Sequence, residues 1–565
     1  MANAVADRVD VVVVGAGFAG LRNLHTFRAQ GLSVAVLEAG SDLGGVWFWN
    51  RYPGARCDVE SYDYSYSFSE ELEQEWRWSE RYATQPEILR YIHHVADRFD
   101  LRRDVHLGQR MTEATWDEQT DRWEVVTASG DRWSARFLVM ATGQLSTTKL
   151  PELPGQESFR GEIHHTGQWP HEPVDFTDKR VGIIGTGSSG MQMIPIVALQ
   201  ARHLTVFQRT ANFSVPATNA FLSDERDAEV KASYRDRREK ALNSPSGLGF
   251  VPSKQSALEA TPEERREHYE YAWTRMGFGF ALAYYDLLRD QAANDTAAEF
   301  IREKIGEQIE DPAVREKLLP RGFPFAAKRP SVDSGYFPTF NRDNVTLADI
   351  REHPITDITE TGIRTTGASY ELDMIVFATG FDALTGSLLR PTITGRGGQT
   401  LKEKWSGGPV TQLGLQVSGF PNMFIIAGPG SPSLLSNVLL STEQHVDWIA
   451  QLLEHLRTHD LDVVEATPDA EQKWVAHVNE RAQETLYPSA PSYYNGDEIP
   501  GKPRVFMPYV GGVRGYRRIL EQVVADGYEG FELRRAAARA DGDSAAARAD
   551  GDSAGEPAEA KVARV

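Results

Sequence analysis

The sequence predicts an α/β fold of two Rossmann-like dinucleotide-binding domains, with a helical insertion in the second of them. Two G-x-G-x-x-G turns support this prediction, because each follows a short apolar run and precedes a helix-forming segment, as in a βαβ unit. The insertion is predicted at 217–324, which is rich in Ala, Glu, Arg and Leu and has few strand signals. The length of 565 residues allows about three or four domains.

The first dinucleotide-binding unit opens the chain. The β-branched run 10–14 predicts a buried parallel strand, a helix follows as far as Gly31, and a second strand at 33–37 ends at Glu38. The turn before the helix contains Gly15, Gly17 and Gly20. Free N–H groups at a helix N-terminus attract a pyrophosphate, and a carboxylate in the place of Glu38 accepts hydrogen bonds from a ribose while repelling a 2′-phosphate. The unit therefore predicts an FAD site.

The second unit repeats this design with one change. The apolar run 181–184 leads into a turn and a helix, and the following strand, 204–207, ends near Arg209 and Thr210. An arginine thus stands where the first unit has its carboxylate, and a planar, permanently charged guanidinium suits a 2′-phosphate. This unit predicts an NADPH site, with the turn made by Gly185, Thr186, Gly187, Ser188, Ser189 and Gly190.

The sequence limits which group can accept electrons from the flavin, because it offers neither a pair of cysteines nor a predicted metal site. Cys57 is the single cysteine, so no internal redox dithiol can form, and we interpret it as a buried small side chain. No Cys/His cluster has the spacing of metal ligands, so no metal is predicted. A flavin–nicotinamide enzyme of this kind passes its electrons to dioxygen or directly to a substrate.

Two further motifs lie beside the two turns. The segment 44–58 is so rich in Gly, Pro and aromatic residues that it predicts a loop, whose flat side chains could shield a flavin ring. Its frame includes Gly45, Trp47, Tyr52 and Asp58. The segment 159–170 reads F-x-G-x-x-x-H-x-x-x-W-P, with Phe159, Gly161, His165, Trp169 and Pro170.

The combination of these motifs resembles that of the Baeyer–Villiger monooxygenases, flavoenzymes that insert one oxygen atom beside a ketone carbonyl. From about residue 8 to 535 the chain looks like the branch that contains phenylacetone and steroid monooxygenases. Further matching segments are AAKR, FNRDNV, ATGFDALTG, GPGSPS and PGKPRVFMPYVGG. Flavin-containing and N-hydroxylating monooxygenases share both G-x-G-x-x-G turns, but their version of the 159–170 motif usually lacks the Trp-Pro ending.

The resemblance implies the catalytic roles. Arg329 matches the family arginine that lies beside the flavin and stabilises negative charge on a C4a-peroxyflavin, and Asp58 matches the aspartate that orients it. Taken without the resemblance, Arg329 is one half of a Lys-Arg pair and could be ordinary surface charge. Lys328 and Arg209 match the pair that holds the 2′-phosphate of NADPH. His165 matches a histidine thought to link domain movement to catalysis, although we favour a hydrogen-bonded structural histidine.

For other positions the resemblance gives a location but no firm role. Tyr493 takes the place of a family tryptophan, so its contacts to the cofactor ribose or to the substrate are in doubt. Pro330 and Leu434 match positions that border the substrate pocket and commonly differ among relatives. Tyr64, Gln144 and Gln192 are assigned to the cofactor sites.

The expected activity is that of an FAD-dependent, NADPH-consuming monooxygenase that uses dioxygen to convert ketones to esters or lactones. The resemblance suggests aryl-alkyl, cyclic or steroid-like ketones, with sulfoxidation as a side activity; it does not give the physiological ketone or the regio- and enantioselectivity. Two alternatives stay open. One is an N- or S-hydroxylating flavin monooxygenase, and the other is a flavin reductase or redox sensor that transfers no oxygen.

Charge and composition limit the partners and the location. The net charge of −20 argues against binding to nucleic acid or to anionic membranes. No apolar run approaches the roughly 18 residues that span a bilayer, and the chain enters its first strand without a signal peptide. A single cysteine suits a reducing compartment, so we expect a cytoplasmic monomer or weak homo-oligomer.

Two near-identical segments mark the expected domain boundaries. The apolar strands in 137–143 and 374–380 both end in Ala-Thr-Gly, and they are predicted to be the two crossings between the domains. Residues 536–565 contain a repeat of AARADGDSA and are predicted to be a disordered tail. The resulting division is an FAD domain at 1–144 and 381–535, an NADP domain at 145–216 and 325–380, and the insertion at 217–324.

Overall fold

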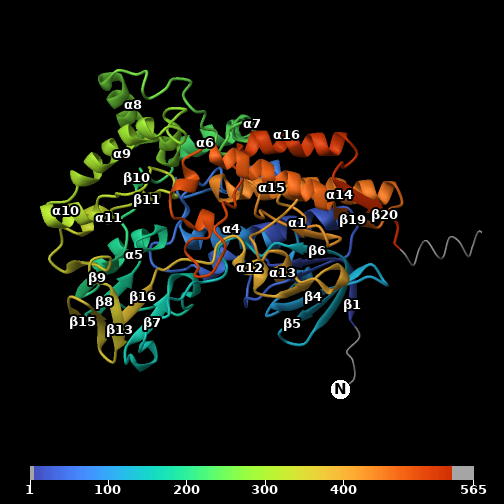
Figure 1. Ribbon diagram of the computed structural model, residues 1–565, viewed down its shortest axis with the longest axis horizontal. Coiled ribbons are helices and arrows are strands. Elements are labelled where there is room, and N and C mark those ends of the chain that lie inside the picture. The colour runs from blue at the N-terminus through green and yellow to red at the C-terminus, as the bar shows by residue number, and fades with distance from the viewer. Residues whose placement is uncertain (1–5, 537–565) are drawn as a thin grey trace, which may run out of the picture.

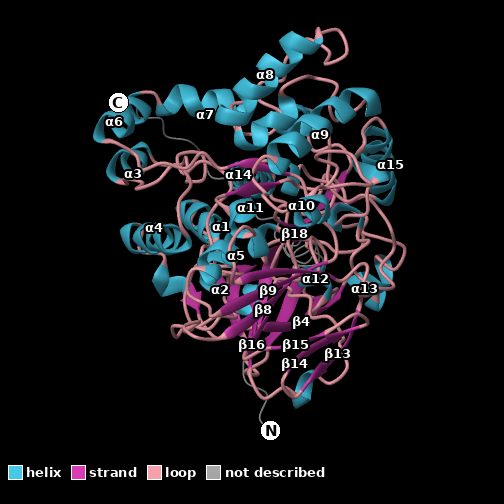
Figure 2. Ribbon diagram, turned by 90° about the vertical axis from the view of Figure 1, so that its left-hand side faces the viewer, coloured by secondary structure: helices cyan, strands magenta, loops and turns pink. Residues whose placement is uncertain are grey.

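The structure is a computed structural model that describes residues 6–536. Two main sheets lie side by side in one half of the molecule, and most of the helices gather above them (Figure 1). From the side, the strands occupy the lower half and the helices of the predicted insertion form the top (Figure 2). The tail predicted at 536–565 lies outside the described residues, apart from its first residue.

The first sheet comprises, in the described part of the chain, β1 (Asp7–Val14), β2 (Val34–Leu37), β3 (Val105–His106), β4 (Met111–Asp117), β5 (Arg122–Thr127), β6 (Arg132–Met140), β17 (Thr392–Thr394) and β18 (Met423–Ile425). Their order is β17-β4-β5-β6-β1-β2-β3, and β18 pairs with the end of β6. The strands β6, β1, β2 and β3 are parallel, whereas β5 runs antiparallel to both of its neighbours. Strands from both ends of the chain thus share one sheet.

The second sheet is entirely parallel, in the order β12-β9-β8-β16-β7. Its strands are β7 (Glu162–His165), β8 (Arg180–Ile184), β9 (His203–Gln208), β12 (Val345–Asp349) and β16 (Met374–Phe377). Smaller sheets are formed by β10 (Ser214–Pro216) with β11 (Ser331–Asp333), by β13 (Ile355–Thr359), β14 (Gly362–Thr365) and β15 (Ser369–Glu371), and by β19 (Val463–Ala466) with β20 (Phe531–Arg534). The predicted α/β class with parallel sheets is confirmed, whereas the exact domain boundaries stay predictions.

Both G-x-G-x-x-G turns lead into the predicted helices, α1 (Phe18–Ala29) and α5 (Ser188–Ala198). The third glycine of each turn is required by packing. A Cβ at Gly20 would lie 1.8 Å from the carbonyl oxygen of Gly15, and a Cβ at Gly190 would lie 2.2 Å from that of Gly185. The first glycine of each turn has a positive φ, +105° at Gly15 and +110° at Gly185, which disfavours any side chain.

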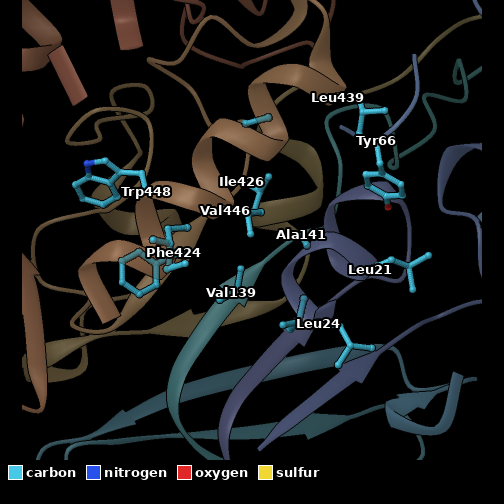
Figure 3. Close-up of a cluster of buried hydrophobic side chains, with 14 of the residues drawn as sticks. Leu21, Leu24, Tyr66, Val139, Ala141, Phe424, Ile426, Leu439, Val446 and Trp448 are labelled. Atoms are coloured by element: carbon cyan, nitrogen blue, oxygen red, sulfur yellow. The ribbon is translucent and has the colours of Figure 1, made fainter. Parts of the chain in front are cut away.

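The main core joins the N-terminal and C-terminal parts of the first sheet. Leu21 and Leu24 of α1 pack with Val139 of β6 and with Val446 of α14 (Val438–Thr458), all fully or almost fully buried (Figure 3). Phe424 of β18 lies in the same cluster. Burial of this apolar surface holds the N-terminal and C-terminal parts of the chain together, although they are far apart in sequence.

The predicted insertion is helical. Within 217–324 the described elements are α6 (Asp224–Ala232), α7 (Tyr234–Leu242), α8 (Pro262–Arg275), a short 3-10 segment (Gly277–Leu282), α9 (Gln291–Gly306) and α10 (Pro312–Leu318). The remaining longer helices are α4 (Gln85–Arg98), α15 (Pro468–Gln483) and α16 (Gly512–Ala525), and the short ones are α3 (Glu70–Glu75), α11 (Tyr336–Thr339), α12 (Gly386–Leu389) and α13 (Leu401–Lys404). No helix in 6–536 combines the length and the apolar character needed to cross a bilayer.

One local prediction is wrong in part. The segment 44–58 contains a single helical turn, α2 (Val46–Trp49), where the sequence predicted only loop. Gly44 and Gly45, both with positive φ, start this turn, and Trp47 and Phe48 bury their rings. Tertiary burial of the aromatic side chains therefore outweighs the loop-forming composition of the segment.

Candidate active site

A cavity of about 660 Å³ lies where the first sheet, α5 and the C-terminal part of the chain meet. Its volume is within the range of about 300–1,000 Å³ that is typical of ligand sites. Fifteen of the residues predicted from the sequence line it: Gly15, Gly17, Glu38, Gly45, Trp47, Tyr52, Asp58, Tyr64, Gln144, Ser188, Ser189, Gln192, Arg329, Leu434 and Tyr493. The structure thus brings together side chains that are spread over most of the sequence.

Other predicted residues lie outside the wall of this cavity. Gly20, Gly185, Gly187 and Gly190 belong to the two turns, whereas Gly161 packs against the backbone of Asp373. Pro330, predicted to border a substrate pocket, is buried. Arg209 is exposed at the end of β9, and Lys328 is half-buried. The complete set outside the wall is Gly20, Phe159, Gly161, His165, Trp169, Pro170, Gly185, Thr186, Gly187, Gly190, Arg209, Thr210, Lys328 and Pro330.

The two helix N-termini are suited to bind pyrophosphates. Both α1 and α5 begin after a glycine, with no side-chain cap and no acidic residue in the first turn. A Cβ at Gly187 would meet no protein atom within 4 Å, so the space in front of α5 is open. Backbone N–H groups and the helix dipole at such an end attract an anion. The residues present therefore fit two dinucleotides.

Glu38 occupies the position expected for a ribose-binding carboxylate. Only 4% of the residue is exposed, and its two oxygens accept hydrogen bonds from the backbone N–H groups of Ala16 and Gly40, each at 2.7 Å. Burial raises the pKa of this carboxyl, although the two backbone bonds and Arg110 oppose that change. Both Glu38 and Arg110 line the cavity, and a carboxylate in this position is suited to accept hydrogen bonds from an adenosine ribose.

The aromatic segment 44–58 connects the two dinucleotide units. Trp47 Nε1 donates to the hydroxyl of Tyr64 at 3.2 Å, and the two rings meet edge to face. The hydroxyl of Tyr52 donates to Gln192 Oε1 on α5 at 2.8 Å, and Gln192 Nε2 donates in turn to the backbone carbonyl of Arg56. Cys57 is buried, as predicted, and burial holds its pKa well above the usual range. The loop thus covers one side of the cavity with fixed rings.

Arg329 is held at the cavity by an ion pair across 271 residues of sequence. Its Nε and Nη2 donate to the two oxygens of Asp58 at 3.1 and 3.0 Å, and its Nη1 donates to the backbone carbonyl of Leu434 at 2.7 Å. Burial opposes its charge, but Asp58 more than compensates, so the pKa of Arg329 lies above its usual range. The side chain is therefore a permanent cation in a defined orientation.

A second group of cations lies beyond α5. Burial lowers the pKa of Lys328, and the nearby charge of Arg209 lowers it further. The same two causes lower the pKa of Lys149, whose Nζ donates to the backbone carbonyl of Glu498. A dianionic phosphate placed near Arg209, Lys328 and Lys149 would stabilise the charged forms of the two lysines, whose pKa values burial and Arg209 lower. Lys149 was not predicted, because a lone lysine in a loop carries no sequence signal.

His165 is hydrogen-bonded on both sides of its ring. Its Nδ1 accepts from the backbone N–H of Gly167 at 2.9 Å, and its Nε2 faces the backbone carbonyl of Lys149 at 3.3 Å. Burial lowers the pKa of this imidazole, so the neutral form with the proton on Nε2 satisfies both contacts. The hydroxyl of Thr379, in the second Ala-Thr-Gly segment, donates to the same carbonyl at 2.5 Å. The histidine thus joins β7 to the end of β16.

A second buried histidine, unpredicted, supports the cavity wall from behind. His445 is 0% exposed, and its Nδ1 accepts from the backbone N–H of Ala427 at 3.0 Å. The carbonyl of Ala427 accepts from Gln144 Nε2, which also donates to Ser433 Oγ at 2.7 Å. Gln144 Oε1 is buried without a protein partner, although the residue lines the cavity. This oxygen is therefore available to a donor on a bound cofactor.

We expect His445 to make the stability of the protein depend on pH. Burial lowers the pKa of its imidazole to about 3 from the ordinary 6.5, because the charged form would be cut off from water. The unfolded chain takes up this proton below about pH 6.5 and the folded protein does not. The stability from this group is thus present above about pH 6.5 and falls by about 1.4 kcal/mol at a pH one unit lower.

Thermal unfolding at about pH 7.5 and pH 5.5 measures this effect. The loss of melting temperature between the two pH values should be smaller in His445→Gln than in the unmodified protein, because glutamine accepts the same hydrogen bond without titrating. An equal loss in both proteins would assign the pH dependence to other groups.

The sequence and the structure of this chain are similar to those of known flavin-dependent monooxygenases. Residues 8–216 match the model of the flavin-binding monooxygenase-like family. Along 94% of its length the chain is 44% identical to a Baeyer–Villiger monooxygenase of Pseudooceanicola batsensis, of which it covers 97%. The chain belongs to the Baeyer–Villiger monooxygenases. FAD and NADPH are therefore the cofactors of this Baeyer–Villiger monooxygenase.

Two further relatives bear on what this Baeyer–Villiger monooxygenase does. Its fold matches the structure of an oxidized steroid monooxygenase bound to NADP with a TM-score of 0.90 and 55% identity, over 94% of this chain and 100% of the other. The chain is also 41% identical to a phenazine N-monooxygenase of Lysobacter antibioticus, over 93% of this chain and 97% of the relative. Proteins this similar thus include one named for oxidation at nitrogen.

Proposed function

We propose that the protein uses NADPH and dioxygen to convert ketones to esters or lactones, with Arg329 as its central catalytic residue. The observation that carries this proposal is the ion pair between Arg329 and Asp58 at the wall of the cofactor cavity. FAD supplies the chemistry that activates dioxygen, and the residues of the chain position the reactants around it. The family relationship agrees with this activity.

The guanidinium of Arg329 is suited to stabilise negative charge on the oxygen that attacks the ketone. Its contacts with Asp58 and Leu434 use three of its five N–H groups, so others remain for an oxygen in the cavity. By accepting from both Nε and Nη2, Asp58 holds the guanidinium of Arg329 in one orientation. A preorganised cation in a site with little water stabilises developing charge without having to reorient.

The three cations beside α5 are suited to hold NADPH. We propose that Arg209, Lys328 and Lys149 contact its 2′-phosphate, with Thr186 and Thr210 at the same edge of the second sheet. Gln192 and Tyr52 would then lie between the two cofactors, because their hydrogen bond joins α5 to the flavin side of the cavity. His165 is proposed to connect this unit to the strand that crosses between the domains.

The substrate would lie on the apolar side of Arg329. Leu434 and Tyr493 line the cavity there and pack in one cluster with Leu145 and Val438. The ring of Tyr493 meets that of Tyr494 edge to face at 4.6 Å, and burial raises its pKa well above the usual range. These surfaces suit aryl-alkyl, cyclic or steroid-like ketones, which present a large apolar body and one carbonyl.

Mass spectrometry of reaction products tests the proposal. The purified holoenzyme is incubated with NADPH, oxygen and a panel of aryl, cyclic and steroid ketones, with samples lacking NADPH as the control. We expect an ester or lactone one oxygen atom heavier than at least one ketone. NADPH consumption that yields only hydrogen peroxide across the whole panel would count against ketone oxidation.

N-oxygenation is the second candidate, because one relative at 41% identity is named a phenazine N-monooxygenase. The same assay distinguishes it when phenazines and tertiary amines join the panel. An N-oxide formed without any ester would replace the first proposal, whereas esters and sulfoxides together would support it. We further propose a cytoplasmic location, because a single, buried cysteine suits a reducing compartment. The expected monomer or weak homo-oligomer stays a prediction.

A further inference from the structure

Both cations of the Lys328–Arg329 pair are covered by a phenyl ring from the helical insertion. Lys328 Nζ lies 4.5 Å from the ring centre of Phe323, and the guanidinium carbon of Arg329 lies 4.4 Å from that of Phe278. Both distances are within the range of about 6 Å over which a cation is attracted by an aromatic face. Lys328 and Arg329, which are neighbours in sequence, thus each contact a different phenyl ring.

The two rings come from separate parts of the insertion but share one core. Phe278 lies in the 3-10 segment after α8, and Phe323 follows α10. Phe323 packs edge to face on Phe213, which packs on Phe325, and Phe325 packs on Phe280. Phe278 and Phe323 both pack against this buried cluster. Their positions are therefore set by a common aromatic core.

The backbone before the cation pair is tied to the same insertion. Asn294 of α9 is 0% exposed, and its amide both donates to and accepts from the backbone of Phe325, at 2.9 and 2.8 Å. Ala326 then adopts a positive φ of +62°, which a buried alanine keeps only where its surroundings hold it. Lys328 and Arg329 consequently leave a rigid backbone, and their side chains are the parts that remain to be oriented.

We propose that Phe323 and Phe278 are positioning residues with separate tasks, Phe323 for cofactor binding through Lys328 and Phe278 for oxygen transfer through Arg329. The inference rests on the roles proposed above for these two cations. Each cation lies over the face of its ring, so N–H groups that point away from the ring can donate to a phosphate or an oxygen. The rings also restrict long side chains that would otherwise sample many rotamers.

The leucine variants Phe323→Leu and Phe278→Leu test the two tasks and serve as controls for each other. In Phe323→Leu the dissociation constant of NADP⁺, measured by fluorescence titration, should rise about fivefold, within the range of a single cation–π contact. The fraction of consumed NADPH that is coupled to ester formation should not change. In Phe278→Leu that fraction should fall about fivefold, with the balance released as hydrogen peroxide, while the NADP⁺ dissociation constant stays the same.

Variants that keep or remove the negative face of the ring distinguish a cation–π contact from simple packing. Tyrosine at either position should recover the property that leucine loses, since it keeps the ring. A fluorinated phenylalanine keeps the shape but loses the negative face, so it should behave like leucine even if leucine itself perturbs folding. Fluorinated variants that behave like the unmodified protein would overturn the inference.

Two reference variants distinguish failure of the inference from failure of the proposed function. If Lys328→Met leaves the NADP⁺ dissociation constant unchanged, the role proposed for Lys328 is wrong. If Lys328→Met weakens NADP⁺ binding but Phe323→Leu does not, only the inference about the ring is wrong. In the double variant the two effects should be less than additive, because the ring acts through the lysine; full additivity would contradict that coupling.

Discussion

Replacing Arg329 by alanine is expected to abolish oxygen transfer while leaving reduction of FAD by NADPH intact. The variant removes a permanent cation that Asp58 holds at the wall of the cavity, beside the apolar residues Leu434 and Tyr493. Loss of a single preorganised donor to developing negative charge typically costs about 100- to 1,000-fold in rate, so ester formation should fall by at least about 100-fold.

Two measurements check this result. Anaerobic bleaching of the flavin absorbance by NADPH should proceed within several-fold of the unmodified rate, whereas aerobic turnover should give hydrogen peroxide in place of ester. Arg56→Ala is the matched control, because Arg56 also lines the cavity, pairs with a carboxylate of Glu80 at 3.1 Å and has a similarly exposed side chain. Ester formation by Arg329→Ala at the control's rate would remove Arg329 from its proposed role.

Replacing Arg209 and Lys328 together by alanine is expected to remove the preference for NADPH over NADH. Each charge-assisted contact to a phosphate contributes about 1.5–3 kcal/mol, which corresponds to about tenfold to 100-fold per cation. The pair should therefore lower kcat/KM for NADPH by about 100-fold or more. kcat/KM for NADH should change little, because NADH has no 2′-phosphate for these cations to contact.

Steady-state kinetics with both nicotinamide cofactors checks this prediction. Arg202→Ala is the control, since Arg202 is an exposed cation in the same unit, just before β9. Equal losses with NADPH and NADH in the double variant would show that the two cations support the fold or the domain arrangement and not the phosphate. If Lys149→Ala also lowers kcat/KM for NADPH and leaves kcat/KM for NADH unchanged, Lys149 contacts the 2′-phosphate too.

The residues near the cofactor site differ in whether the sequence could identify them. Arg209 was predicted because it occupies a fixed place in a repeated βαβ pattern, at the end of the second strand. Lys149 and His445 belong to no such pattern. They reach the site because a loop and a long helix fold against it, and nothing in their sequence neighbourhoods records that contact.

The sequence by itself determined the α/β class, the two dinucleotide-binding units, the helical insertion and the pair of cofactors. These features depend on short-range requirements, such as the backbone clash that excludes any side chain at Gly20 or Gly190, and such requirements leave a readable pattern. The charge at Glu38 and at Arg209 is equally local, since each stands at the end of a strand next to its own turn.

Only the tertiary structure decided the full set of contacts that hold Arg329, the proposed catalytic cation. Arg329 meets Asp58 across 271 residues, its third hydrogen bond goes to the backbone of Leu434, and its face is covered by Phe278 of the insertion. With Arg329 itself, these contacts join four separate segments that burial of apolar surface brings together. The resemblance to the family predicted Asp58 as a partner of Arg329. Because burial depends on the total packing and not on neighbours in sequence, no local pattern specified the carbonyl of Leu434 or the ring of Phe278.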